Sequence, residues 1–207
     1  MNKPKKKSWL DYLIYVIWGL IFVSMIYEIP ISLSNSIIWF IGLFLAVLVY
    51  YKINLPKWLY FGALLILFAN ASGEIISGFF FANSSAGFFY TVQNYDKILH
   101  LLDPLIICPL IYYLLKEKIE NKKILILISV ALLLSFELIW EIWEYFSDLF
   151  LGTHLQGVFI YVKDSLGNLQ LTQTMSPLTD TIYDMLDNLI GSLIWAAGAL
   201  FFTRKKK

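Results

Sequence analysis

Residues 136–148 read Phe136-Glu137-Leu138-Ile139-Trp140-Glu141-Ile142-Trp143-Glu144-Tyr145-Phe146-Ser147-Asp148, which sets four acidic residues inside a long apolar segment. The segment begins at Ile124 and is long enough to cross a lipid bilayer as a helix. The acids recur at i, i+4, i+7 and i+11, so a helix would carry all four on one face. Because a charge at membrane depth is unfavourable by about 2.5–3.5 kcal/mol, we expect this face to lie against other polar groups.

The composition of the whole chain is that of a multi-pass membrane protein. Of its 207 residues, 59% are hydrophobic and 15% are charged, and the mean hydropathy is +0.69. A soluble domain of this length could not remove so much apolar surface from water. The chain has a single cysteine, Cys108, which excludes an internal disulfide. We find no nucleic-acid-binding motif, so the expected partners are membrane lipid and a small-molecule or lipid-linked substrate.

The predicted fold class is all-α: one polytopic membrane helix bundle over residues 1–207, with six transmembrane helices. In this arrangement 14 of the 16 Lys and Arg residues fall on one side of the membrane, and only Lys97 and Lys163 fall on the other. By the positive-inside rule both termini are therefore cytoplasmic. The predicted spans are 10–27, 37–51, 58–81, 98–115, 124–149 and 179–202.

The outer loop before the last span has the pattern of a β-hairpin. Two β-prone runs, at 158–162 and 169–172, flank a turn that contains Gly167 and Asn168. The hairpin is expected over residues 157–173.

The last four predicted spans each carry a polar stripe in the outer half of the membrane. All four stripes follow the i, i+4, i+7 spacing, and seven residues cover ~10 Å of helix rise, so the stripes fall in one layer. Lipid cannot solvate such stripes, so we expect them to face one another around a polar cavity open to the outside. The acids of this layer are Glu74, Asp96, Asp103, Glu137, Glu141, Glu144, Asp148, Asp180, Asp184 and Asp187.

This number of neighbouring carboxylates predicts a bound divalent metal ion, whose identity the ligand types leave open. The local bases are Lys97 and His100, so either some acids are protonated or a cation lies among them. Clusters of acids and histidine on facing helices are how carboxylate metal sites are built, and such ligands suit Mg²⁺, Mn²⁺, Ca²⁺, Zn²⁺ or non-haem iron. The predicted metal ligands are His100, Glu141, Glu144, Asp184 and Asp187. The predicted catalytic residues are Glu141, Glu144, His100 and Asp184, supported by Glu74, Asp96, Asp103, Glu137, Asp180 and Asn188.

Structural interpretations compete for some of these residues. Asp96, Asp148 and Asp180 fall near the membrane interface, where acids at helix ends are readily solvated, and Asp180 is placed to cap the last span. Glu137 is the deepest acid, and as a protonated carboxylic acid it could bond to a neighbouring helix.

Several of these polar residues also resemble the signature of a known family. The matching positions are Tyr95-Asp96-Lys97, His100, Glu137, Trp140-Glu141, Glu144, Gly152, Gln156-Gly157, Asp180-Thr181, Asp184, Asn188 and Gly191. Together they resemble a prokaryotic integral-membrane family of unknown function that is distantly similar to the VanZ-like proteins. The resemblance covers residues 95–191 and implies a multi-pass protein of a prokaryotic cell membrane, with these positions as its polar signature. It implies no reaction, and Asp103-Pro104 departs from the small or apolar residues expected after the histidine.

Two function classes follow from the predicted cavity. The first is an enzyme at the outer leaflet, performing metal-assisted hydrolysis or transfer on a lipid-linked or phosphorylated substrate. The alternative is a transporter of protons or cations that uses the same carboxylates. A conduit needs polar groups at both ends, whereas the inner parts of the last three spans are almost wholly apolar, so the sequence favours a one-sided site. A polar network that only specifies helix pairing is a third interpretation.

Overall fold

The computed structural model describes residues 8–28, 33–80, 95–151, 156–157, 159–163, 165 and 168–204. Within these ranges it contains six long helices and one two-stranded sheet. Each helix overlaps one predicted span, and α2 extends its span by four residues at the start, to Leu33. The elements are α1 (Trp9–Glu28), α2 (Leu33–Lys52), α3 (Lys57–Phe80), α5 (Tyr95–Leu115), α6 (Lys122–Leu151), β1 (Phe159–Lys163), β2 (Leu169–Gln173) and α7 (Pro177–Arg204).

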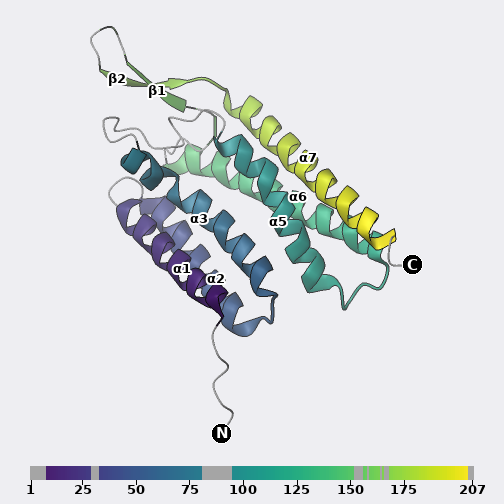
Figure 1. Cartoon of the computed structure of the whole chain (residues 1–207). Helices are drawn as coiled ribbons and strands as arrows, with labels where there is room; N and C mark the ends of the chain where they lie inside the picture. The colour runs from purple at the N-terminus through teal and green to yellow at the C-terminus, as the bar shows by residue number, and fades with distance from the viewer. Residues whose placement is uncertain are drawn as a thin grey trace.

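The helices lie side by side in two groups of three (Figure 1). The first group is α1, α2 and α3, and the second is α5, α6 and α7. In both groups the first and third helices make the most extensive contact, and within the described residues it is α3 against α5 that joins the groups. Helix α1 begins and α7 ends at the same end of the bundle, away from the hairpin (Figure 1).

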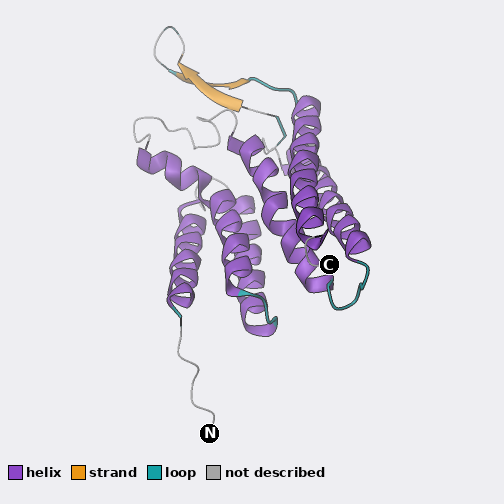
Figure 2. Cartoon of the chain, turned by 45° about the vertical axis from the view of Figure 1, so that its right-hand side comes forward, coloured by secondary structure: helices purple, strands orange, loops and turns teal. Residues whose placement is uncertain are grey.

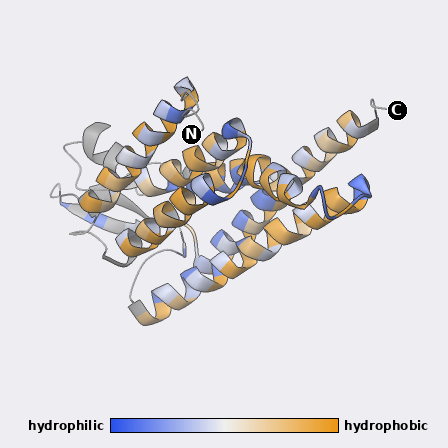
Figure 3. Ribbon diagram, turned by 90° about the horizontal axis from the view of Figure 1, so that it is seen from below, coloured by the Kyte–Doolittle hydropathy of each residue, from blue (hydrophilic) through white to orange (hydrophobic). Residues whose placement is uncertain are grey.

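The outside of the bundle is apolar, as lipid contact requires. Leu127 and Phe150 on α6 and Phe202 on α7 are largely exposed, and hydrophobic residues dominate the helices (Figure 3). Among the described residues, four helices contain stretches long and apolar enough to cross a membrane: Trp9–Ile26, Asp96–Leu115, Lys122–Phe150 and Pro177–Thr203. Helices α2 and α3 contribute shorter apolar stretches, Ser36–Lys52 and Lys57–Ser72. The protein is therefore an all-α membrane helix bundle.

An ion pair between a buried carboxylate and an exposed lysine holds the first group together. Asp11 on α1 is buried and accepts hydrogen bonds from the Lys57 ammonium at the start of α3 and from the Tyr50 hydroxyl of α2. The Ser8 backbone N–H donates to the same carboxylate at 2.6 Å. A buried carboxylate is tolerable only when it is paired in this way, so the contact fixes the mutual positions of all three helices.

In the second group, helices α5 and α7 approach so closely that one position must be glycine. A Cβ atom at Gly191 of α7 would collide with the backbone carbonyl oxygen of Leu101 on α5 and would lie 3.0 Å from Cγ of Pro104. Nearby, the buried Cys108 thiol lies 4.0 Å from the Ser192 hydroxyl. Small side chains thus bring the polar residues of α7 against α5, in the manner of close-packed membrane helices.

The β-hairpin predicted from the sequence is confirmed. Strands β1 and β2 pair antiparallel, from Phe159 opposite Gln173 to Lys163 opposite Leu169, and they lie beyond the helix ends (Figure 2). The chain then enters α7 through Ser176, whose hydroxyl accepts a hydrogen bond from the Thr179 backbone N–H at 3.2 Å. Ser176 is therefore the N-cap, and the expectation that Asp180 caps this helix is wrong.

Candidate functional site

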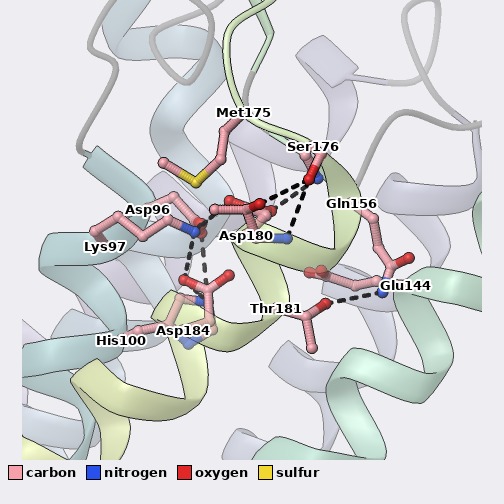
Figure 4. A network of polar contacts seen from close by, with 12 residues as sticks. Asp96, Lys97, His100, Glu144, Gln156, Met175, Ser176, Asp180, Thr181 and Asp184 are labelled. Atoms are coloured by element: carbon pink, nitrogen blue, oxygen red, sulfur yellow. Dashed lines mark hydrogen bonds and ion pairs between the residues drawn. The ribbon is translucent and has the colours of Figure 1, made fainter.

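A polar cluster joins α5 and α7 at the hairpin end of the bundle, and Lys97 lies at its centre (Figure 4). The Lys97 ammonium lies 3.1 Å from Asp96 Oδ2 and 2.6 Å from Asp184 Oδ1, and it also pairs with Asp180. Asp96 and Lys97 occupy the first turn of α5, while Asp180 and Asp184 are one turn apart on α7. The close α5–α7 contact places these two helix starts opposite each other.

Within this cluster, Asp96, His100 and Asp184 form a group able to hold a metal ion. His100 Nε2 lies 3.5 Å from Asp96 Oδ1 and 3.6 Å from Asp184 Oδ1. One ligand atom from each residue lies within 4.8 Å of the other two, the arrangement expected around a shared cation. The donors are two carboxylates and an imidazole, which suit divalent ions of the first transition row as well as harder cations.

The other ring nitrogen of His100 is held by residues from α6 and α7. Nδ1 lies 2.9 Å from Asn188 Nδ2 and 3.6 Å from Glu137 Oε2. Asn188 Nδ2 also donates to Glu137 Oε2 at 3.1 Å. Hydrogen bonds to the second nitrogen of a histidine fix the orientation of its ring, as is usual for histidines that bind metals.

Burial and charge favour a cation at this position. The side chain of Asp184 is only 1% exposed, whereas that of Asp96 is 38% exposed, so the cluster opens at Asp96. Three carboxylates, those of Asp96, Asp180 and Asp184, pair with Lys97, and a fourth, that of Glu137, lies against His100. One lysine therefore leaves the cluster anionic when these acids are ionised and His100 is neutral. A buried excess of negative charge is stabilised by cations or protons and repels anions.

Glu141 and Glu144 are buried in α6 beside this cluster but do not belong to the three-residue group. Glu144 accepts a hydrogen bond from Trp140 Nε1 at 2.7 Å and is close enough to Glu141, Asp96 and Asp184 for electrostatic interaction. Neither carboxyl oxygen of Glu141 has a hydrogen-bond partner of normal geometry among the described residues, although the Thr181 hydroxyl lies beside it.

Two residues that follow α6 fold back and tie α6 to α7. Gln156 donates through its backbone N–H to Asp148 Oδ2 at 2.9 Å and through Nε2 to Thr181 Oγ1 at 3.2 Å. The Gly157 backbone N–H donates to Asp180 Oδ2 at 2.8 Å, with φ at 92°, a conformation that favours glycine. Asp148 and Asp180 thus have hydrogen-bond partners in this loop. Asp180 is buried and also pairs with Lys97, so it is not the solvated helix-end acid of the structural interpretation.

The remaining predicted residues lie in different surroundings. Asp187 is half-buried and outside the three-residue group. Asp103, one turn from His100, keeps a buried Oδ1 without a hydrogen-bond partner among the described residues. The side chain of Glu74 lies outside the part of the chain that the structure describes.

Sequence reasoning missed the central position of Lys97, which it treated only as a local base. The available signal was its place beside Asp96 in a helix start, in a layer otherwise filled by acids. The contacts of Gln156 and Gly157 were also missed, although both residues belong to the motif that carried the family resemblance.

The fold and this cluster define a multi-pass membrane protein with a buried carboxylate–histidine site. The chain belongs to the predicted membrane protein family DUF2238, whose family model matches residues 8–206. The predicted resemblance to an integral-membrane family of unknown function is thereby confirmed, while the more distant similarity to VanZ-like proteins stays a prediction. Comparison with the curated proteins and with the solved structures gave no match.

Proposed function

We propose that this protein binds a divalent cation in the outer half of the cell membrane, which it crosses six times with both termini in the cytoplasm. The Lys and Arg asymmetry along the sequence supports this orientation. Helices α2 and α3 have 20 and 24 residues. At 1.5 Å per residue they are roughly 30 and 36 Å long, enough to span the hydrocarbon core.

The proposed ligands are Asp96, His100 and Asp184. The observation that carries this proposal is the position of His100 Nε2 between two carboxylate oxygens, at 3.5 and 3.6 Å. To coordinate a metal through Nε2, His100 must carry its proton on Nδ1. Glu137 Oε2 can accept that proton's hydrogen bond, as can Asn188 Oδ1 after a half-turn of the amide.

The chemistry that this site best serves is hydrolysis or group transfer on a lipid-linked or phosphorylated substrate. A bound cation would neutralise the substrate's anionic group or activate water. Glu141 and Glu144, buried next to the ligands, are the proposed proton acceptors. Support for a one-sided site comes from the apolar packing deeper in the second group, around Cys108, Ile111 and Leu133.

Metal analysis of the detergent-purified protein tests this proposal. We expect about one or two divalent ions per chain, the range of carboxylate sites in helix bundles. Asp184→Asn and His100→Ala should each weaken Mn²⁺ binding, measured by calorimetry, at least about a hundredfold, because each removes one of only three ligands. Combining Asp184→Asn with Glu141→Gln should abolish it.

Two further variants serve as comparisons in the same titration. Glu120→Gln removes an exposed acid between α5 and α6 and should bind as the wild type does. Asp187→Asn distinguishes two sets of ligands. It should bind Mn²⁺ as the wild type does if the ligands are Asp96, His100 and Asp184, and more weakly if the wider set predicted from the sequence is correct, because Asp187 belongs only to the wider set. Unchanged metal content in Asp184→Asn/Glu141→Gln would rule out the site.

A cation or proton transporter is the second candidate, and the helix arrangement favours it. The first helix of the second group begins at the opposite end of the bundle from the first helix of the first group (Figure 1), as in transporters built from inverted repeats. In each group an ion pair with a buried aspartate joins the starts of the first and third helices: Asp11 with Lys57, and Asp180 with Lys97. Cation or proton flux into proteoliposomes that Asp184→Asn abolishes would establish this function, and absence of flux from a metal-binding protein would exclude it.

A further inference from the structure

We infer that Lys97 and a divalent cation are alternative occupants of one carboxylate site, so that Lys97 sets the affinity of the site and its selectivity for divalent over monovalent ions. This inference rests on the cation binding proposed above. It adds a residue that is not a ligand and that acts by competing for the ligands.

Lys97 and the proposed cation would both bind the same oxygen of Asp184. Asp184 Oδ1 lies 2.6 Å from Lys97 Nζ and is also the oxygen that faces His100 Nε2 at 3.6 Å. Asp96 is shared as well, since its Oδ2 faces Lys97 at 3.1 Å while its Oδ1 faces His100 at 3.5 Å. A cation coordinated by Asp96, His100 and Asp184 would therefore lie directly beside the lysine ammonium.

Electrostatic repulsion makes joint occupancy unfavourable. The Lys97 side chain is only 12% exposed, and charges in such surroundings are weakly screened. A divalent ion and an ammonium within a few ångströms would repel each other strongly, so the ammonium must withdraw from Asp184. The ammonium can then pair with Asp180 alone, or turn toward the open side of the cluster at Asp96.

This exchange explains why the cluster can exist without bound metal. Lys97 then neutralises part of the carboxylate charge, which would otherwise be buried without a partner. A monovalent ion that displaced Lys97 would replace one positive charge by another, so its electrostatic free energy of binding would be small. A divalent ion adds a charge, so the lysine discriminates against Na⁺ and K⁺.

Calorimetric titration of the full-length, detergent-purified protein with Mn²⁺ tests the inference. Lys97→Met removes the ammonium but keeps an unbranched side chain. We expect it to bind Mn²⁺ at least tenfold more tightly than the wild type, which corresponds to about 1.4 kcal/mol. We also expect Na⁺ to compete with Mn²⁺ in Lys97→Met and not in the wild type.

Two further variants keep the test decisive. Lys97→Arg retains the positive charge and should bind Mn²⁺ no more tightly than the wild type. If Lys97→Met fails to fold because its carboxylates are uncompensated, Lys97→Met/Asp180→Asn restores the charge balance, and it should still bind more tightly. Wild-type-like or weaker Mn²⁺ binding by the neutral variants, with measurable binding by the wild type, overturns the role of Lys97 alone. No Mn²⁺ binding by any of the proteins overturns the proposed function as well.

Discussion

At the level of single residues, burial separates acids that look equivalent in the sequence. Asp184 and Asp187 are three positions apart on α7, yet Asp184 is fully buried in the ligand group while Asp187 is half-buried outside it. Helical spacing predicts a shared polar face but not which member of the face meets the neighbouring helix. The same limit explains Lys97: its pairing with Asp180 and Asp184 depends on contact between α5 and α7, which no local pattern specifies.

Glu141 provides a prediction at this scale. The residue is only 4% exposed, and its buried carboxyl group lacks a hydrogen-bond partner of normal geometry among the described residues. Glu141→Gln removes a buried charge, keeps the shape and still offers an oxygen to the Thr181 hydroxyl. In metal-free protein it should therefore raise the free energy of unfolding by about 1–3 kcal/mol.

Thermal unfolding in detergent with a chelator measures this effect. The exposed Glu120→Gln should leave the midpoint temperature unchanged, which separates a burial effect from a general loss of charge. A lower midpoint for Glu141→Gln than for the wild type would mean that the ionised carboxylate is needed for stability.

At the level of elements, local patterns in the sequence were sufficient to predict the helices and the hairpin, but not the contacts between helices. The β-hairpin depends on two short β-prone runs around a turn, so residues near each other in the chain determine it. The helices likewise follow from continuous apolar runs. The close α5–α7 contact depends on one glycine, Gly191, meeting the backbone of another helix. No local pattern distinguishes Gly191 from Gly198, the other glycine of α7.

The two glycines of α7 therefore make a matched pair of variants. Gly191→Ala would push against the Leu101 carbonyl and Pro104, whereas a Cβ at Gly198 meets nothing within 4 Å. Gly191→Ala should lower the free energy of unfolding by about 1–3 kcal/mol, the usual range for overpacking. It should also weaken Mn²⁺ binding, because it moves Asp184 away from His100.

Gly198→Ala should leave both quantities unchanged or slightly raise stability, since alanine favours helix. Thermal unfolding and calorimetry of the two variants give the comparison. Equal behaviour of the two would show that α5 and α7 are not in close contact at Gly191.

At the level of the whole molecule, composition and charge carried most of the prediction. The lengths of the apolar runs predict the number of long helices. The positions of Lys and Arg predict that α1 begins and α7 ends at the same end of the bundle (Figure 1). Each helix carries that information itself. The division into two three-helix groups, each with an ion pair to a buried aspartate, cannot be predicted in this way, because it depends on which helices pack together.

The proposed orientation across the membrane can be measured directly, because the chain's one cysteine, Cys108, is buried and should not react. Ser165→Cys adds a thiol to the exposed hairpin turn, and Glu120→Cys adds one to the connection between α5 and α6. In intact spheroplasts, a membrane-impermeant maleimide should label Ser165→Cys and leave Glu120→Cys unlabelled. After permeabilisation both should react, while the wild type stays unlabelled. Labelling of Glu120→Cys in intact spheroplasts would reverse the orientation and place the Asp96–His100–Asp184 group at the cytoplasmic face, where neither an outer-leaflet substrate nor an extracellular cation could reach it.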